Sequence, residues 1–260
     1  MMIRRAANRW RRFSIEHFAR REFRLTGTTP YVSFTFDDFP RTALTEGGRI
    51  LLRHKVRGTY FVSLQLLNSD TASGRVASLP DLQTLLTDGH ELGCHTFGHL
   101  DGSVVTADDF AASIDANRAA LETSGLGIQF ETFAYPLSGP AVATKRVAGS
   151  RFRGCRGGGQ QFNSDTIDLS HLKAYFLDRR NRPQIKDIAD LIQRNAAAKG
   201  WLIFATHDVA DHASQYGCDP GDFEAVVRLA IESGARVMPM IDVCRELGIA
   251  HQPRTSHTSV

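Results

Sequence analysis

The most constraining feature of this sequence is the regular alternation of short apolar runs with longer amphipathic segments. The apolar runs have the length of buried strands, and the segments between them have the periodicity of helices that cover a sheet. This pattern predicts strands at 31–36, 58–63, 91–95, 129–135, 151–155, 173–177, 201–206 and 236–240. It predicts helices at 43–54, 79–88, 106–124, 141–148, 184–199, 219–233 and 241–247. Such alternation favours parallel strands joined by crossover helices. Four glycines, Gly89, Gly125, Gly200 and Gly234, stand where helix C-caps are expected.

Eight strands of this kind predict an α/β fold, an irregular (β/α) barrel of seven or eight parallel strands. An open doubly wound sheet is the alternative, but no glycine-rich loop follows the first strand, which weakens a dinucleotide-binding interpretation. The 260 residues, 42% of them hydrophobic, suit one large domain. We place this domain at residues 27–248, after a basic arm or amphipathic helix at residues 1–26. We expect the polar tail at residues 249–260 to be disordered.

The positive charge of the chain is concentrated at its N-terminus. Residues 1–24 contain eight arginines against two glutamates, with aromatic side chains interleaved among them. Such a segment can lie on an anionic membrane surface, or it can be a solvated helix that packs a few aromatics on the outside of the barrel. A nucleic-acid partner is not expected, because the net charge is only +3 and no nucleic-acid-binding module is present.

Targeting features are also absent from the sequence pattern. No apolar stretch has the length of a membrane span, and no apolar core follows the basic N-terminus as it does in a signal peptide. The four cysteines are scattered without CxxC spacing, which favours reduced thiols. We therefore expect a cytoplasmic protein, peripheral at the inner membrane face if the basic arm binds lipid.

Polar residues follow four of the predicted strands at their C-terminal ends. They are Asp37 and Asp38, His95 and His99, Tyr135 and Pro136, and His207 and Asp208. The C-terminal ends of parallel strands meet at one rim, which is where barrel enzymes keep their active sites. The sequence therefore predicts a single functional site at this rim.

The first two of these clusters suit a divalent metal ion. Two neighbouring aspartates beside an apolar core repel each other, and a cation that binds one carboxylate keeps the other ionised. His95 and His99, four residues apart on a helical turn, can direct both imidazoles at one point. Each pair alone has an ordinary explanation, as a turn after a strand or an accidental spacing. Together they indicate a metal centre with one spare carboxylate.

The segments that carry these residues resemble the polysaccharide deacetylases, the chitooligosaccharide deacetylase-like (NodB-homology) family also known as carbohydrate esterase family 4. Residues 35–38 match the first motif of that family, TFDD, and residues 95–99 match its second, H-[ST]-x-x-H. Residues 133–136 and 206–208 resemble its third and last motifs. The resemblance spans about residues 31–240, and it implies an irregular (β/α) barrel of the glycoside hydrolase/deacetylase type. It also implies metal-dependent removal of an N-acetyl group from an amino sugar.

Carried over by position, the resemblance implies a role for each polar residue. Asp38, His95 and His99 would bind the metal, with zinc as the expected ion and cobalt, nickel or manganese as alternatives. Asp37 would be the general base that deprotonates the attacking water, and His207 would be the general acid that protonates the departing amine.

The third-motif turn is expected to contact the reacting group. The motif match makes the backbone N–H of Leu137 a donor to the developing oxyanion. Tyr135 and Pro136, in the same turn, are further candidates for oxyanion or substrate contact.

Two departures from the family pattern affect the surroundings of the site. Ala134 stands where the family often has an arginine that pairs with the base, so Arg156, in a glycine-rich loop, and Arg41, after the first motif, are candidates for that cation. The fourth motif, Asp-x-x-Asp-Trp, is also missing. The carboxylate that orients His207 is therefore left among three residues, which are Asp165, Asp168 and Asp178.

Three functions fit these observations. The leading one is an N-deacetylase whose partner is an N-acetylated glycan. The second is a deacylase or deformylase of a lipid-linked amino sugar, with residues 1–24 on an anionic membrane surface. The third is a non-catalytic glycan-binding relative. The presence of a suitable residue at every acid, base and metal position argues against this third function.

Overall fold

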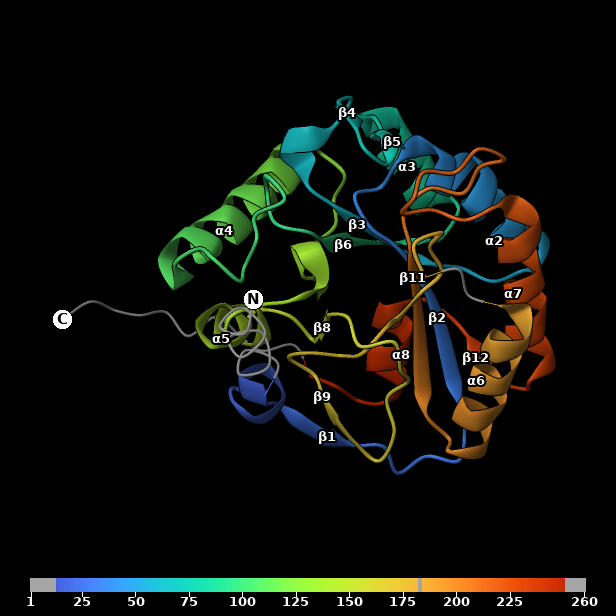
Figure 1. The fold of residues 1–260 in the computed structure, drawn as a ribbon. Coiled ribbons are helices and arrows are strands. Elements are labelled where there is room, and N and C mark those ends of the chain that lie inside the picture. Colours follow the sequence, from blue (N-terminus) through green and yellow to red (C-terminus); the bar gives the residue numbers. More distant parts are fainter. Residues whose placement is uncertain (1–12, 182–183, 251–260) are drawn as a thin grey trace, which may run out of the picture.

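The computed structural model describes residues 13–181 and 184–250 of the 260-residue chain. A curled sheet of parallel strands forms the centre of the molecule, and helices cover its outer face (Figure 1). The predicted tail from residue 251 onward and the first twelve residues of the predicted basic arm lie outside the described residues.

The eight predicted strands all belong to one parallel sheet. Across it they run in the order β10 (Tyr175–Phe176), β11 (Trp201–Thr206), β2 (Tyr31–Phe36), β3 (Thr59–Val62), β6 (Glu91–Cys94), β7 (Thr132–Ala134) and β8 (Gly154–Arg156), with β12 (Arg236–Val237) beside β2. Irregular residues connect the end strands β8 and β10. The Leu172 N–H donates to Cys155 O (2.7 Å), and the Gly157 N–H donates to Leu172 O (2.8 Å). The predicted irregular barrel of parallel strands is therefore confirmed.

The predicted helices are present as well. They are η1 (Ala43–Gly48) continued by α2 (Arg49–Arg53), α3 (Leu79–Thr87), α4 (Ala107–Thr123), α5 (Val142–Gly149), α6 (Ile185–Ala197), α7 (Pro220–Glu232) and α8 (Met240–Glu246). The first of them is split, because η1 is a π-helix and α2 is an α-helix. Two short 3₁₀ turns are η2 (Leu64–Leu66) and η3 (Pro136–Ser138).

Glycines end three of these helices as the sequence predicts. Gly89, Gly125 and Gly234 follow the C-caps of α3, α4 and α7 with φ of 78°, 73° and 78°. This left-handed conformation favours glycine, because it carries no Cβ. At the end of α6 the prediction of Gly200 is wrong, since Lys199 takes the left-handed position with φ of 53°. Gly200 is needed for space instead, because a Cβ there would lie 2.7 Å from Asn163 O.

Alternation along the strands divides the buried side chains between two cores. In β11, Leu202 and Phe204 point outward and pack in the larger cluster beneath the helices, whereas Trp201 and Ile203 belong to the cluster inside the barrel. Inside the barrel, the Trp201 indole N–H donates to Ser33 Oγ at 3.0 Å. The interior of the barrel is therefore filled by packed side chains, and the candidate functional residues lie at its rim.

The N-terminal residues are part of this domain from residue 13 onward. Residues 13–17 are helical, and β1 (Glu22–Arg24) pairs antiparallel with β9 (Thr166–Asp168), neither of which the sequence pattern predicts. The fully buried Lys145 holds the segment in place. Its ammonium pairs with Asp168 Oδ2 (2.6 Å) and donates to the carbonyls of Ile15 (2.5 Å) and Phe18 (2.9 Å). Residues 13–24 of the predicted basic arm or amphipathic helix are thus docked on the barrel.

Two further features complete the architecture. A short hairpin, β4 (Asp70–Thr71) with β5 (Gly74–Arg75), projects above β3 and α3 (Figure 1). Within residues 13–181 and 184–250, no helix has the length and apolar character needed to cross a membrane.

The closed end of the barrel, opposite the rim, contains a buried carboxyl group. Glu91 begins β6, and its oxygens accept hydrogen bonds from the hydroxyls of Thr59 (2.7 Å) and Thr132 and from the Ile241 N–H of α8 (2.9 Å). Burial raises the pKa of Glu91 to about 7, although these three hydrogen bonds favour its charged form. The folded protein therefore holds a proton on Glu91 at a pH where the unfolded chain has lost it.

This difference makes part of the stability depend on pH. Between pH 4.5 and about 7 the folded state binds the Glu91 proton more tightly, so the contribution of this group to the free energy of unfolding is lost as pH rises. Glu91→Gln removes this pH-dependent contribution to the free energy of unfolding. We expect the variant to gain about 3 kcal/mol relative to the wild type across that window, measured by urea unfolding at several pH values. Burial lowers the pKa of His90 to about 4, so His90 changes the stability with pH in the opposite direction to Glu91. Because His90 is present in both proteins, its contribution cancels when the variant is compared with the wild type.

Candidate metal centre

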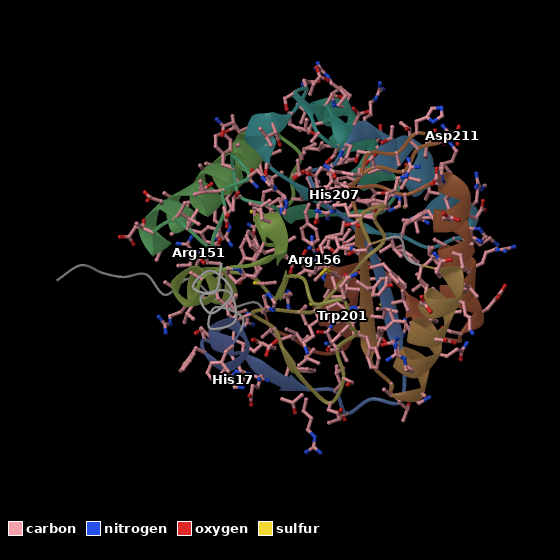
Figure 2. All side chains as sticks on the ribbon, in the orientation of Figure 1. His17, Arg151, Arg156, Trp201, His207 and Asp211 are labelled. Carbon is pink, nitrogen blue, oxygen red and sulfur yellow. The ribbon has the colours of Figure 1, made fainter. Side chains whose placement is uncertain are left out.

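The predicted site residues meet at one rim of the barrel. Asp37 and Asp38 follow β2, His95 follows β6, Arg156 ends β8 and His207 follows β11. The strands β2 and β11 are neighbours in the sheet, with Phe36 opposite Thr206. The Asp37 N–H donates to Thr206 O at 2.9 Å, so the ends of the two strands lie side by side. Figure 2 shows His207 and Arg156 near the centre of the molecule, above Trp201.

Asp38, His95 and His99 form a cluster with the composition of a metal site. One ligand atom from each lies within 4.8 Å of the others. Asp38 Oδ1 is 3.5 Å from His95 Nε2 and 3.2 Å from His99 Nε2, and this buried oxygen has no hydrogen-bond donor. An unsatisfied buried carboxylate oxygen that faces two imidazole nitrogens suits a divalent cation.

The imidazole of His95 is held in the form that binds a metal. Its Nδ1 lies 2.8 Å from the carbonyl oxygen of Ala134 and must donate to it, so the lone pair of Nε2 faces Asp38. Burial lowers the pKa of His95 to about 4 despite the opposing charges of Asp37 and Asp38. The ring is therefore neutral at physiological pH and available as a ligand.

The second-motif histidines lie on a bent loop, and the prediction of a helical turn is wrong. Thr96 and His99 have φ of 62° and 56°, outside the helical region. The Thr96 hydroxyl accepts the Leu100 N–H at 2.8 Å and closes this bend. Because the loop turns back, His99 Nε2 still approaches Asp38.

Strained backbone is concentrated around the cluster. Asp38, His99 and Leu137 have φ of 58°, 56° and 55°, a region that non-glycine residues rarely adopt. Each such residue costs of the order of 1 kcal/mol and persists only where its surroundings impose the geometry. Such strain at three loops of one rim is typical of a functional site.

Asp37 is the spare carboxylate, and Arg156 supplies its counter-charge. The Arg156 guanidinium is fully buried, pairs with Asp37 Oδ1, and lies 5.4 Å from the ring centres of both Phe61 and Phe176. Burial raises the pKa of Asp37, but the charge of Arg156, with smaller contributions from His95 and His207, holds the pKa below its usual value.

The structure distinguishes the two candidate cations for Asp37. Arg41 forms its ion pair with Asp81 at 3.1 Å on the surface, so Arg156 is the partner of the carboxylate. Ala134, where the family arginine is expected, is the register partner of Arg156 on the neighbouring strand. Residues in register point to the same face of a sheet. Arg156 on β8 therefore takes the position beside Asp37 that the family pattern assigns to an arginine at residue 134 on β7.

His207 approaches the cluster from the end of β11. Its Nε2 lies 3.9 Å from Asp38 Oδ2, and its Nδ1 lies 3.2 Å from the carbonyl oxygen of Tyr216. The Tyr216 carbonyl also accepts the His207 N–H at 3.2 Å, so one peptide group fixes both the backbone and the ring. The loop that carries Tyr216 is closed by Asp208, whose carboxylate accepts the Ser214 N–H and hydroxyl, each at 2.6 Å.

Two of the three carboxylates proposed to orient His207, those of Asp168 and Asp178, are engaged elsewhere. Asp168 pairs with Lys145 (2.6 Å) and Asp178 pairs with Arg180 (2.5 Å), while the Asp165 peptide oxygen accepts the Leu25 N–H at 2.8 Å. Sequence reasoning missed Tyr216, because a main-chain carbonyl has no residue-type signal.

The third-motif turn presents one of its three candidate residues to solvent. Leu137 is 70% exposed at the rim. Tyr135 points into the core instead, where its hydroxyl donates to Ser170 O at 2.8 Å, and Pro136 is buried beneath the turn.

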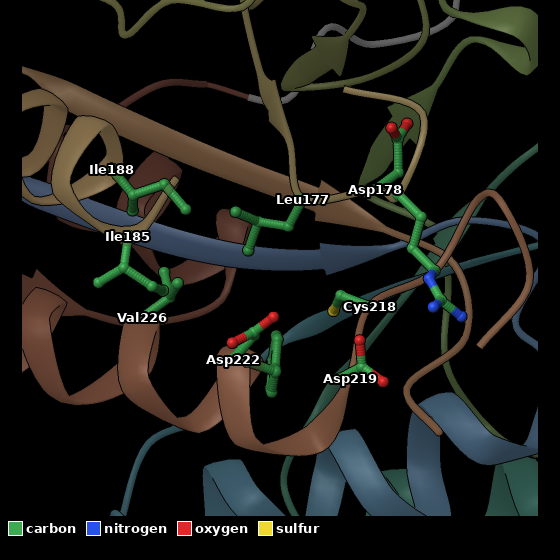
Figure 3. Close-up of a pocket in the computed structure, with 10 residues that line it drawn as sticks. Leu177, Asp178, Ile185, Ile188, Cys218, Asp219, Asp222 and Val226 are labelled. Carbon is green, nitrogen blue, oxygen red and sulfur yellow. The ribbon is translucent and has the colours of Figure 1, made fainter. Parts of the chain in front are cut away.

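A separate cavity of about 450 Å³ lies between α6 and α7 (Figure 3). Ile185, Ile188 and Val226 form its apolar wall, and Asp219 and Asp222 lie at its edge. Asp178, one of the candidates to orient His207, lines this cavity, but Asp38, His95 and His99 do not, so the cavity is distinct from the metal cluster at the rim.

Comparison with known proteins agrees with the geometry of the first two motifs. The family model described as polysaccharide deacetylase matches residues 24–151, which include Asp37, Asp38, His95, His99 and Leu137. This part of the chain belongs to the polysaccharide deacetylase family. Arg156 and His207 lie beyond the matched residues of the deacetylase domain.

A relative of known description matches part of the same domain. It is a bifunctional xylanase/deacetylase of Pseudobutyrivibrio xylanivorans, 30% identical over 100 residues. The match covers 38% of this chain but only 15% of the length of that relative.

Solved structures share the fold of the deacetylase domain over most of its length. The Xyl-CE4 domain of a multidomain xylanase from the hindgut metagenome of Trinervitermes trinervoides has a TM-score of 0.62 at 18% identity, covering 87% of this chain and 95% of that one. A family 4 acetyl xylan esterase from Clostridium thermocellum, in complex with a cobalt ion, has a TM-score of 0.61 at 17% identity, covering 85% and 93%. A family 4 pseudoenzyme from Bacillus anthracis has a TM-score of 0.59 at 13% identity, covering 85% and 68%. Because active and inactive proteins share this fold, function has to be argued from the site.

Metal binding by the cluster is directly measurable. We expect the purified protein to bind a single divalent ion. His95→Ala should weaken binding by at least about a hundredfold, because it removes a ligand that the Ala134 carbonyl holds in place. Calorimetric titration of chelator-treated protein with zinc, cobalt, nickel and manganese measures this. His212→Ala, at an exposed position, is the matched control with unchanged affinity. Equal binding by the His95 and His212 variants would place the metal elsewhere.

Proposed function

We propose that this protein is a metal-dependent hydrolase that removes an N-acetyl group from an amino sugar of a glycan. The observation that carries the proposal is a three-residue metal cluster that has both a carboxylate, Asp37, and an imidazole, His207, beside it. This arrangement contains the separate acid and base that amide hydrolysis requires.

The metal and the chain divide the chemistry between them. Bound by Asp38, His95 and His99, a divalent ion supplies Lewis acidity, which polarises an amide carbonyl and acidifies water. Asp37 accepts the proton of the attacking water. Since the charge of Arg156 holds the pKa of Asp37 low, the carboxylate is ionised when substrate arrives and readily releases the proton afterwards.

The leaving group and the oxyanion need donors of their own. His207 donates a proton from Nε2 to the amine nitrogen, while its Nδ1 stays bound to the Tyr216 carbonyl. We assign the Leu137 N–H to the developing oxyanion, on the basis of its place in the third-motif turn. The amine leaves as a neutral molecule, and acetate is the second product.

The role of Asp37 can be separated from metal binding. Asp37→Asn keeps the size of the side chain and removes the proton acceptor, so we expect kcat for acetate release to fall by about 10²–10⁴. The divalent ion should remain bound, because Asp38, His95 and His99 are intact. Asp211→Asn, at an exposed position of the loop after β11, is the control with unchanged turnover. Near-normal activity of Asp37→Asn excludes it as the base, and inactivity of the wild-type protein on N-acetylated glycans would indicate a binding protein.

A lipid-linked amino sugar is the second candidate substrate, because the N-terminal segment exposes two large apolar side chains. Phe13 is 45% exposed and Phe18 is 50% exposed, directly after an arginine-rich sequence. Aromatic residues beside arginines favour the interface of an anionic membrane.

Substitution tests the membrane role better than removal of residues 1–24, which would also remove the groups bound by Lys145. We expect Phe13→Ser with Phe18→Ser in the full-length chain to weaken sedimentation with phosphatidylserine vesicles by at least about tenfold. Ile231→Ser on α7, which is 37% exposed, is the matched control. Equal sedimentation of both proteins would exclude a membrane role of these phenylalanines.

A further inference from the structure

The loop that begins with His207 extends outward from the barrel. It runs from His207, near the centre of the molecule, to Asp211 at its edge (Figure 2) and then returns to the start of α7. The segment that follows β10 leaves the sheet beside this loop, because the Thr206 hydroxyl donates to Leu177 O at 3.0 Å. Residues 178–181 are therefore in a position to hold the loop.

Main-chain hydrogen bonds join the two segments on both sides of Tyr216. The Arg180 N–H donates to Gln215 O at 3.3 Å. The Arg179 N–H donates to Gly217 O at 3.1 Å. The Tyr216 carbonyl, which supports the candidate general acid, thus lies between two hydrogen bonds to the segment after β10.

The Arg180 side chain adds a contact to the ring of Tyr216. Its guanidinium carbon lies 4.5 Å from the centre of that ring, within the range of a cation–π interaction. The ring centres of Tyr216 and His207 are in turn 5.4 Å apart, with an angle of 46° between the ring planes. The guanidinium therefore holds the aromatic side chain that lies beside the imidazole.

A buried carboxylate fixes the guanidinium in this place. Asp178 Oδ2 accepts hydrogen bonds from Nη2 of Arg180 at 2.5 Å and from its Nε at 3.2 Å. The other oxygen, Oδ1, accepts the Asn181 N–H at 2.9 Å. The Asp178 side chain has no exposed surface, whereas that of Arg180 is 46% exposed. Because a planar guanidinium bound at two nitrogens has little freedom left, its position over Tyr216 is set before substrate binds.

The direction of the His207 ring decides whether it can act as an acid. A carbonyl oxygen only accepts hydrogen bonds, so Nδ1 of His207 donates to Tyr216 O, and Nε2 is the atom that faces Asp38. Proton transfer needs the donor within hydrogen-bonding reach of the atom that it protonates. A shift of the Tyr216 peptide would turn the ring and carry Nε2 away from the departing amine.

We propose that Arg180 is a positioning residue for His207, and that it acts by holding the Tyr216 peptide through the stacked ring. This inference rests on the proposed function, because it takes His207 as the proton donor to the amine. It adds to that acid a residue beyond residues 24–151, the part of the chain that the family model matches.

Two leaving groups distinguish this role from a general loss of structure. Arg180→Met removes the charge and the planar group, so we expect kcat for acetate release from a chitooligosaccharide to fall about tenfold with KM little changed. Hydrolysis of para-nitrophenyl acetate should fall less than about twofold, because nitrophenolate leaves without a proton from an acid. Arg228→Met, at an exposed position of α7, is the matched control with wild-type kinetics. Equal losses on both substrates, or no loss on either, would overturn the proposal.

Substitutions of Tyr216 test the path of the effect. Tyr216→Ala removes the ring and keeps the main-chain carbonyl, so it should lower kcat as much as Arg180→Met does. The double variant should lose no more than either single variant, because both break the same contact. Tyr216→Phe keeps a ring under the guanidinium and should restore most of the activity that Tyr216→Ala loses. Losses that multiply in the double variant would contradict a shared path.

A measurement on the imidazole itself separates this inference from the proposed function. By NMR of protein with added zinc, the Nδ1 proton of His207, assigned by its absence from His207→Gln, should exchange with water at least about tenfold faster in Arg180→Met than in the wild type. If the wild-type protein releases no acetate but the exchange accelerates in this way, the positioning role stands and the hydrolase does not. If acetate is released but the exchange is the same in both proteins, the hydrolase stands and the role of Arg180 is wrong.

Discussion

The candidate site depends on one ion pair that crosses the mouth of the barrel. Arg156 ends β8 and Asp37 follows β2, and three strands of the sheet separate them. Both side chains are buried, so removing either would leave an unpaired charge in the interior at a cost of about 3–5 kcal/mol. The same guanidinium outweighs the effect of burial on the pKa of Asp37. Folding of the rim and the chemistry proposed for it therefore rely on a single contact.

Much of the fold follows from sequence pattern alone, because the strands are short apolar runs and the helices end at recognisable glycines. Gly89, Gly125 and Gly234 end helices as expected, whereas Lys199 replaces Gly200 where packing against Asn163 requires the glycine for space. The residues that anchor the docked N-terminus could not be predicted in the same way. Its anchor, Lys145, lies on a helix where a lysine ordinarily faces water, and its burial depends on Asp168 and two distant carbonyls.

The site shows the same division between local and non-local information. The sequence indicates Asp38, His95 and His99 through their spacing, and the structure places their ligand atoms within 4.8 Å of one another. It does not indicate the bend of the histidine loop, because left-handed φ at Thr96 and His99 is imposed by tertiary contacts. It cannot identify the support of His207 either, since that support is the peptide oxygen of Tyr216.

The register between β7 and β8 has a consequence for how relatives of this chain are judged. Ala134 and Arg156 are directly opposed, and both face the barrel interior, so an arginine from either strand can neutralise the same carboxylate. A motif defined on β7 alone would score this protein as lacking the arginine, although an arginine one strand away pairs with Asp37. Relatives with a small residue in place of the motif arginine should therefore be called inactive only after the cross-strand neighbour has been inspected.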